Sequence, residues 1–286
     1  MIIPSFNSLI YLKKSLRALL HQTFSSWEGI IVDNGSEDGT GKWIEENYPE
    51  FRLLSFPYNA GFAKAVNRGA ELSRGKYLVV MNADVVLERD FLKKFYRKIN
   101  QRKEIGIWQP LVLYPDGDTI YSTGILLSSA RRVYNRGEGR RISEEESVKE
   151  EEIWGVAGCC AVVKREVFTE LEGFDEDFFF LLEDFDFSWR ARKKGWRFMY
   201  FPDAVVYHIG RVTLSRKFRQ YLSFRNRYLL LVKNENLKDF LLNLPSILIY
   251  EAFRVPYFFL VNPYRGKAMR ELLLLLPRKL KERWKE

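Results

Sequence analysis

The first hundred residues alternate short apolar runs with stretches of helical spacing, and this alternation constrains the fold more than any other feature of the chain. Four apolar runs predict strands, and they read MIIPSF, GIIVDN, FRLLSF and KYLVVMNAD. Helical spacing predicts helices over residues 11–22, 42–48, 63–73 and 90–100. Such alternation favours parallel strands joined by crossover helices, so we expect an α/β fold with a mixed sheet flanked by helices.

Polar residues follow three of these predicted strands at the point where each strand ends. They are the segments Ser5–Asn7, Asp33–Ser36 and Asn82–Asp84. In open α/β sheets, ligands bind in the crevice outside the carboxyl ends of the strands. We therefore expect a binding site where these three segments meet.

The middle of the chain is less regular. Residues 131–152 are almost all charged, Gly or Ser, and this composition predicts a mobile surface loop whose individual residues carry no chemistry. Beyond it, the sequence WGVAGCCAVVKREVF predicts a buried strand followed by a short helix.

The stretch FFFLLEDFDFSWR sets three carboxylates, Glu183, Asp184 and Asp186, directly after five large apolar residues. Acidic residues at its start, basic residues near its end and Gly195 just beyond predict a helix from Glu183 to Lys194. Two interpretations of the carboxylates stay open. They stabilise the helix, or one of them is a base whose pKa is raised by desolvation.

The net charge of +9 lies entirely in the last quarter of the 286 residues. Residues 215–286 carry 16 Lys/Arg against 6 Asp/Glu, and residues 1–214 carry 30 against 31. We therefore divide the chain into a body, residues 1–214, and a basic, apolar C-terminal tail, residues 215–286. Within the body we expect two halves, over about residues 1–110 and about residues 111–214. The tail should have an anionic partner.

The sequence also indicates the cellular compartment in which the protein is expected. Cys159 and Cys160 are adjacent and would form a very strained disulfide, so we expect free thiols and a reducing, cytoplasmic setting. No charged-then-apolar leader opens the chain, so export is not expected. The uncharged runs Phe240–Tyr250 and Val255–Tyr264 fall short of the roughly 18 residues of a membrane span, so we expect no transmembrane helix.

Six motifs together resemble the family-2 glycosyltransferases of the GT-A fold, particularly the bacterial rhamnosyltransferase-like branch. In order, they read IIPSFN, IIVDNGSEDGT, NAGFAKAVNRG, MNADV, GFDEDFFFLLEDFDFSWRARKKGW and YFPDAVVYHIGR. The resemblance covers Ile2 to about Asn234. It implies transfer of a sugar from a nucleoside diphosphate to an acceptor hydroxyl, with inversion at the anomeric carbon. It also implies that residues 1–110 form the nucleotide-sugar half of the body and residues 111–214 the acceptor half.

The resemblance also implies site residues. For the nucleotide, an aromatic ring would stack on the base and a carboxylate would accept hydrogen bonds from base or ribose; the residues are Pro4, Phe6, Asn7, Asp33, Gly35, Asn59, Asn82 and Ala83. For a divalent metal, Mg²⁺ or Mn²⁺, it implies Asp84 and His208. Asn82 stands where the family has the first carboxylate of a DXD motif, which should weaken metal affinity.

For catalysis, Asp184 matches the aspartate of the family's ED pair and would remove the acceptor's proton, with Glu183 as its neighbour. The remaining residues that we assign to sugar or acceptor are Trp154, Gly158, Asp186 and Arg211. Rhamnose is the first donor sugar expected, and the acceptor would be a lipid-linked or other cell-surface glycan.

Basic amphipathic segments such as those of the tail bind anionic membrane surfaces, so we expect peripheral association with the inner face of the cell membrane. The alternative is a helical unit that packs on the body, or a homodimer contact.

Two other functions are alternatives, and the sequence argues against both. A sugar-nucleotide pyrophosphorylase needs an N-terminal glycine-rich loop, and PSFNSLIYLKK contains no glycine. A nucleic-acid-binding protein would carry its positive charge on the body, which is close to neutral.

Overall fold

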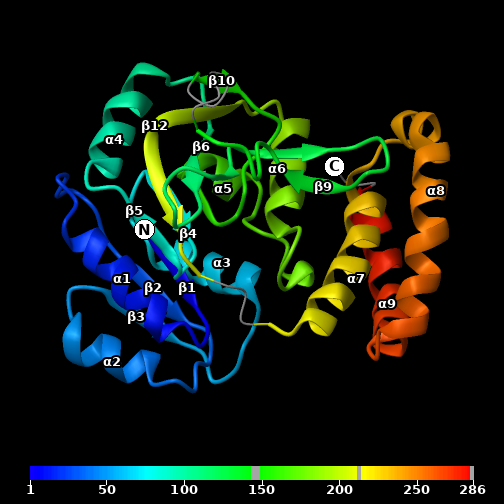
Figure 1. Cartoon of the computed structure of the whole chain (residues 1–286), viewed down its shortest axis with the longest axis horizontal. Coiled ribbons are helices and arrows are strands. Elements are labelled where there is room, and N and C mark those ends of the chain that lie inside the picture. The colour runs from blue at the N-terminus through cyan, green and yellow to red at the C-terminus, as the bar shows by residue number, and fades with distance from the viewer. Residues whose placement is uncertain (143–148, 211–213, 284–286) are drawn as a thin grey trace.

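The computed structural model describes residues 1–142, 149–210 and 214–283, and a mixed sheet forms its centre (Figure 1). Within these residues the order of the main sheet is β10-β12-β6-β11-β4-β1-β2-β3, with β5 paired to β12 and β7 to β6. The strands are β1 (Ile2–Ser5), β2 (Ile30–Asp33), β3 (Arg52–Ser55), β4 (Tyr77–Met81), β5 (Val85–Leu87), β6 (Ile107–Leu113), β7 (Ile120–Ser122), β10 (Glu151–Glu152), β11 (Cys160–Lys164) and β12 (Phe198–His208). A second, two-stranded sheet pairs β8 (Ile125–Leu127) with β9 (Val133–Asn135).

The helices complete the α/β pattern. They are α1 (Leu9–Leu20), α2 (Thr40–Asn47), α3 (Phe62–Leu72), α4 (Phe91–Gln101), α5 (Arg165–Glu170), α6 (Glu183–Lys193), α7 (Arg216–Asn234), α8 (Leu237–Val261) and α9 (Arg265–Arg283), with a 3₁₀ turn, η2, at Glu176–Phe178. The eight elements predicted for the first hundred residues all form, and so do the predicted strand and helix after residue 154 and the helix that begins at Glu183. The predicted fold class is therefore confirmed.

The parallel part of the sheet positions the site. β1 pairs in parallel with β2 on one side and β4 on the other, and β2 pairs in parallel with β3. Ser5 lies opposite Asp33 in this register, so the polar ends of β1 and β2 are adjacent. The strand order reverses at β1, which is where open α/β sheets leave a crevice for a ligand.

Two layers of helices cover the sheet, and the alternation of side chains along each strand explains why. Ile3 and Val79 face α1, α2 and α4, whereas their neighbours Ile2 and Val80 face α3, α5 and α6. Successive strand residues point to opposite faces, so strands that are buried on both faces must be apolar throughout.

The antiparallel part of the sheet brings distant residues to the crevice. β11 lies between β4 and β6 and runs antiparallel to both, and β12 pairs with β5 so that His208 lies opposite Val85. This pairing sets His208 beside Asp84, although more than a hundred residues separate them in the chain.

The C-terminal tail packs on the body. α7 contacts α6 and η2, and α9 packs along α7. Figure 1 shows α8 on the outer side of this group, away from the sheet. One hydrophobic cluster includes Tyr221, Leu222 and Leu272 of the tail together with core residues of the body. The predicted alternative of a helical unit packed on the body therefore describes α7 and α9.

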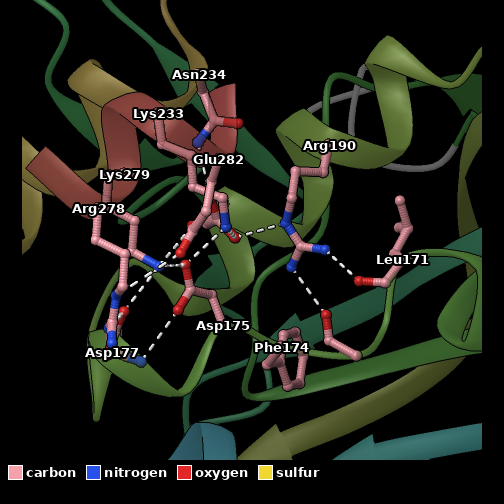
Figure 2. Close-up of polar contacts among 12 residues, drawn as sticks. Leu171, Phe174, Asp175, Asp177, Arg190, Lys233, Asn234, Arg278, Lys279 and Glu282 are labelled. Atoms are coloured by element: carbon pink, nitrogen blue, oxygen red, sulfur yellow. Dashed lines mark hydrogen bonds and ion pairs between the residues drawn. The ribbon is translucent and has the colours of Figure 1, made fainter. Parts of the chain in front are cut away.

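A buried cluster of charges also joins the tail to the body (Figure 2). Lys279 of α9 is 2% exposed, and its Nζ lies 2.6 Å from Asp175 Oδ2 and 2.8 Å from Asp177 Oδ2. Lys233 of α7 pairs with Asp175 at 2.7 Å and with Asp186 at 3.1 Å. Because unpaired charges are costly to bury, this cluster specifies how α7 and α9 dock.

α8 corrects the expectation that the two apolar runs of the tail are separate and each too short to span a membrane. The two apolar runs that we treated separately join in a single helix of 25 residues, which passes through Pro245, Glu251, Arg254 and Pro256. Among the described residues, α8 is long and apolar enough to cross a membrane, judged by length and composition alone. Its most apolar window has a mean hydropathy of 1.4. Only 11% of that window is buried.

The segment 131–152 is also more ordered than expected. β9 pairs with β8, β10 pairs with β12, and the Arg136 guanidinium forms an ion pair with Glu151. The part of the predicted mobile loop at residues 143–148 lies outside the described residues.

Candidate active site

A cavity of about 510 Å³ lies at the carboxyl ends of β1 and β4. This volume falls in the range that holds a nucleotide-sized ligand. Ten of the sixteen predicted site residues line it, and they are Pro4, Phe6, Asn59, Asn82, Ala83, Asp84, Gly158, Glu183, Asp184 and His208. The sheet edge, the start of α6 and the end of β12 thus meet at one site.

Asp84 follows β4 and is held in place by its surroundings. Its Oδ1 lies 3.6 Å from Nε2 of His208, and the His208 ring stacks on Tyr121 with 4.5 Å between centroids. A side chain at Gly210 would overlap the Asp84 carboxylate, so the chain needs glycine at that close approach. Burial raises the pKa of Asp84, while His208 acts in the opposite direction.

The Asp84 and His208 pair fits a divalent cation in part. Oδ1 of Asp84 is buried and has no hydrogen-bond partner among the described residues, so one carboxylate oxygen remains to be satisfied. Hard divalent cations prefer such oxygen ligands and accept phosphate oxygens and waters for the rest. No cluster of three His, Cys, Asp or Glu residues occurs in the part of the chain that the structure describes, so the protein itself would supply few ligands.

Asp184 is the second residue of α6, and two backbone donors fix its carboxylate. Oδ2 accepts a hydrogen bond from the Gly158 N–H at 2.7 Å, and Oδ1 accepts one from the Phe185 N–H at 2.8 Å. Burial nevertheless raises the pKa of Asp184, and these hydrogen bonds only partly oppose it. The side chain is therefore a stronger base than an exposed aspartate.

Glu183 lies beside Asp184 and is 4% exposed. Its Oε2 is buried without a hydrogen-bond partner among the residues described. Burial, and then the nearby charge of Asp184, raise the pKa of Glu183 well above its usual value. The protonated form of Glu183 is thus favoured, and the pair shares one negative charge more readily than two.

The apolar wall before these acids lines the cavity through Phe179, Phe180, Leu181 and Leu182. Three of them adopt a positive φ, at 63° for Phe179, 72° for Leu181 and 71° for Leu182. Residues other than glycine hold this conformation only where the surroundings impose it.

Asn226 of α7 supplies that constraint. Its Nδ2 donates to the carbonyl oxygens of Phe178, Phe180 and Leu181 at 2.8, 3.0 and 2.6 Å. Asn226 is fully buried. A residue of the tail therefore shapes the wall next to Asp184, and no motif in the sequence singled it out.

The predicted nucleotide residues divide into two groups. Phe6 and Asn59 line the cavity, and so does Asn34, which belongs to the predicted polar segment Asp33–Ser36 but had no role assigned to it from the sequence. Asn34 donates to Asn59 Oδ1 at 3.0 Å and to the Gly61 carbonyl at 3.1 Å. Three further predicted residues, Asn7, Asp33 and Gly35, lie next to the cavity lining and not in it.

Neither Asp186 nor Trp154 is part of the cavity lining, so the structure does not bring these two predicted residues to the cavity. Asp186 is fully buried and is bound by Arg190 Nε at 2.7 Å, Lys233 Nζ and Asn234 Nδ2. These partners lower its pKa despite burial, with Arg190 foremost. Trp154 stacks on Phe185 with 4.2 Å between centroids. Arg211 lies outside the described residues.

The segment that we expected to carry no chemistry contributes to the site. Val133, Tyr134, Asn135 and Glu138, from β9 and the turn after it, line the cavity. Charge-rich composition gave no signal of this, because the pairing of β9 with β8 depends on a strand outside the segment.

Comparison with known proteins gives this geometry a context. The model of the family described as glycosyl transferase family 2 matches residues 1–172. The N-acetylglucosaminyl-diphospho-decaprenol L-rhamnosyltransferase of Mycobacterium tuberculosis is 28% identical over 220 residues, which cover 69% of this chain and 71% of that protein.

Two solved structures share the fold. TarS 1–349 of S. aureus in complex with UDP gives a TM-score of 0.61 at 15% identity, and the match covers 99% of this chain and 82% of that one. GalNAc-T7 with UDP, GalNAc and Mn²⁺ gives a TM-score of 0.63 at 15% identity, covering 81% of this chain and 47% of that one.

Proposed function

The chain belongs to glycosyl transferase family 2 and is a nucleotide-sugar-dependent glycosyltransferase, and we propose that it moves a sugar, first of all rhamnose, to a hydroxyl of a lipid-linked glycan with inversion. The observation that carries the proposal is that Asp84 and Asp184 line one cavity of about 510 Å³. In such a cavity one carboxylate can act at the departing diphosphate while the other acts on the attacking hydroxyl.

In this proposal Asp184 is the general base. Its carboxylate accepts the proton of the acceptor hydroxyl as that oxygen attacks the anomeric carbon and the bond to the diphosphate breaks. The two backbone hydrogen bonds hold the carboxylate in place, and the apolar wall keeps water away from it. Glu183, whose protonated form is favoured, orients Asp184 and does not compete for the proton.

Asp84 and His208 would hold a divalent cation at the diphosphate. When bound, such a cation neutralises negative charge on the departing phosphate oxygens. Asn82, in place of a carboxylate, lines the cavity beside Asp84 and would donate hydrogen bonds to a ribose or phosphate oxygen. At the other end, the Phe6 ring, which lines the cavity, would stack on the base.

Peripheral membrane association is the second part of the proposal. α8 exposes large apolar side chains along its length, among them Leu242 at 68%, Phe253 at 77% and Leu260 at 81%. Basic side chains of the tail lie near them in the sequence. Apolar surface rimmed by cations favours the headgroup layer of an anionic membrane, where a lipid-linked acceptor would be found.

The proposal is tested in two steps. A thermal-shift screen of UDP, dTDP and GDP, each with and without Mn²⁺, identifies the nucleotide and the metal requirement, because a ligand that binds only the folded state raises the Tm. The matching nucleotide sugars are then tested for nucleoside diphosphate release with N-acetylglucosaminyl-diphospho-polyprenol as acceptor. Failure of every nucleotide to shift the Tm would contradict the proposal.

Asp184→Asn tests the base. We expect it to keep the nucleotide-induced shift and lose about 10²- to 10⁴-fold in turnover, the usual contribution of a general base. Glu183→Gln is the matched control, because glutamine mimics the protonated neighbour, and it should lose far less. Equal losses in the two variants would refute the assignment to Asp184.

A further inference from the structure

A second cavity of about 480 Å³ lies between α7 and α8 and adjoins the active site. We call it the α7/α8 groove, and its lining residues are Leu181, Arg216, Arg219, Gln220, Ser223, Phe224, Arg254, Tyr257, Phe258 and Val261. Leu181 and Ser223 line both this groove and the catalytic cavity, so the two spaces are neighbours.

The charge of the groove has one sign. Three of its lining residues are arginines, Arg216, Arg219 and Arg254, and none of the described lining residues is an aspartate or glutamate. Arg254 is already fixed, because its Nη2 donates to the Ser223 carbonyl at 2.9 Å and its Nη1 lies 3.4 Å from Glu251. Three guanidinium groups along one apolar groove provide donors for a ligand with more than one phosphate.

One of these donors is unsatisfied. Nε of Arg219 is buried and has no hydrogen-bond partner among the residues that the structure describes. Buried N–H groups are almost always paired, and leaving one unpaired is costly. Oε1 of Gln220 is also buried without a partner among the described residues, but it is an acceptor, and only the two N–H groups of that amide could donate to a phosphate. A ligand in the groove would satisfy the Arg219 N–H.

The far side of the groove is apolar and continues onto the surface. Phe258 and Phe224 stack with 3.9 Å between centroids and form its floor. Tyr257, 53% exposed, and Val261, 36% exposed, form its rim, and the exposed Phe253 and Leu260 extend the apolar surface along α8. A hydrocarbon chain that leaves the groove would therefore lie on apolar side chains.

We infer that the α7/α8 groove binds the diphosphate of a lipid-linked acceptor, with its lipid chain along α8 and its sugar directed past Leu181 and Ser223 toward Asp184. The inference rests on the proposed function and deepens it, since it assigns the acceptor a site separate from that of the donor nucleotide. It also explains why cationic residues gather next to the catalytic cavity on a helix that otherwise supports its wall.

The test uses farnesyl diphosphate, a short isoprenoid diphosphate, and isothermal titration calorimetry with the full chain. We expect the wild-type protein to bind it at least tenfold more tightly than farnesol. Arg219→Gln and Arg216→Gln should each weaken that binding about tenfold or more, because each removes charge-assisted hydrogen bonds. Arg270→Gln removes the same charge from an exposed position on α9 outside the groove lining, so it should bind as the wild type does.

Three results would overturn the inference. The first is that the wild type does not bind farnesyl diphosphate. The second is that Arg219→Gln and Arg270→Gln weaken its binding equally. The third is that the wild type binds phosphatidylglycerol vesicles more tightly than farnesyl diphosphate and that Arg219→Gln weakens both interactions to the same extent. The nucleotide-induced thermal shift is measured on the same variants and should not change. If no nucleotide raises the Tm of the wild type, the proposed function is contradicted, whereas the binding of farnesyl diphosphate to the groove is still supported by its own measurement.

Discussion

Lys279→Met tests whether buried charge holds the C-terminal tail to the body. Nζ of Lys279 lies 2.6 Å from Asp175, 2.8 Å from Asp177 and 2.8 Å from Glu282, so all three of its protons have acidic partners. The side chain is 2% exposed. Methionine keeps much of the apolar volume and removes the charge, which leaves the partners under-compensated (Figure 2).

The magnitude follows from what each partner retains. Removing one member of a buried ion pair typically costs about 3–5 kcal/mol. We expect about 3 kcal/mol, the lower end of that range, because Asp175 keeps Lys233 at 2.7 Å and Glu282, 37% exposed, can turn to water. An unfolding entropy of roughly 2.1 cal/mol/K per residue gives about 0.6 kcal/mol/K for a chain of this length. The Tm should therefore fall by about 5 °C.

Thermal and urea unfolding followed by circular dichroism measure the change, and Lys281→Met is the control. Lys281 lies two residues further along α9 and is exposed, so its substitution should change stability by less than about 0.5 kcal/mol. Equal stability of the two variants would refute the role of the cluster.

The same comparison has a pH dependence. The pKa of Asp175, which Lys279 contacts, is lowered by Lys233 and Lys279 against the effect of burial. A lowered pKa contributes stability above the ordinary pKa of about 4, and that contribution is lost as the pH falls through the folded-state value. The advantage of the wild type over Lys279→Met should therefore shrink on acidification below about pH 4.

Three further outcomes are expected. Gly210→Ala should abolish any Mn²⁺-dependent part of the nucleotide thermal shift, because the added methyl group would displace Asp84; an unchanged shift would contradict the metal assignment. The acid limb of kcat/KM should have an apparent pKa above the usual 3.9 of an aspartate, since Asp184 must be deprotonated to act and burial raises its pKa; a limb at or below the usual value would refute this. Asn226→Ala should cost about 1–3 kcal/mol in urea unfolding, because the Phe180 and Leu181 carbonyls lose their donor while the Phe178 carbonyl keeps Arg225 Nη2, and activity should fall with it.

The period of the apolar residues predicted the α/β fold because it is a local signal. Strands buried on both faces must be apolar throughout, and helices between them must be amphipathic, so the pattern is present in any window of about ten residues. The polar ends of β1 and β4 could be placed at one edge for the same reason, and Phe6, Asn82 and Asp84 do line the cavity there.

The same local signals could not distinguish among neighbouring acids. Asp184 and Asp186 are two positions apart on α6, and a helix turns about 100° per residue, so their side chains point about 200° apart. Which of them faces the cavity depends on where α7 packs. Asp184 meets the Gly158 N–H, and Asp186 meets Lys233 and Asn234 of the tail.

By itself, then, the sequence determined the order of the strands and helices, the edge of the sheet that carries the site and the family to which its motifs belong. Only the tertiary structure decided that β9 lines the cavity, that Asn226 holds its wall and that three arginines form a groove beside it. These features depend on contacts between segments far apart in the chain. They are stabilised by burial of groups that come into contact only in the folded chain, so no local pattern of residues predicts them.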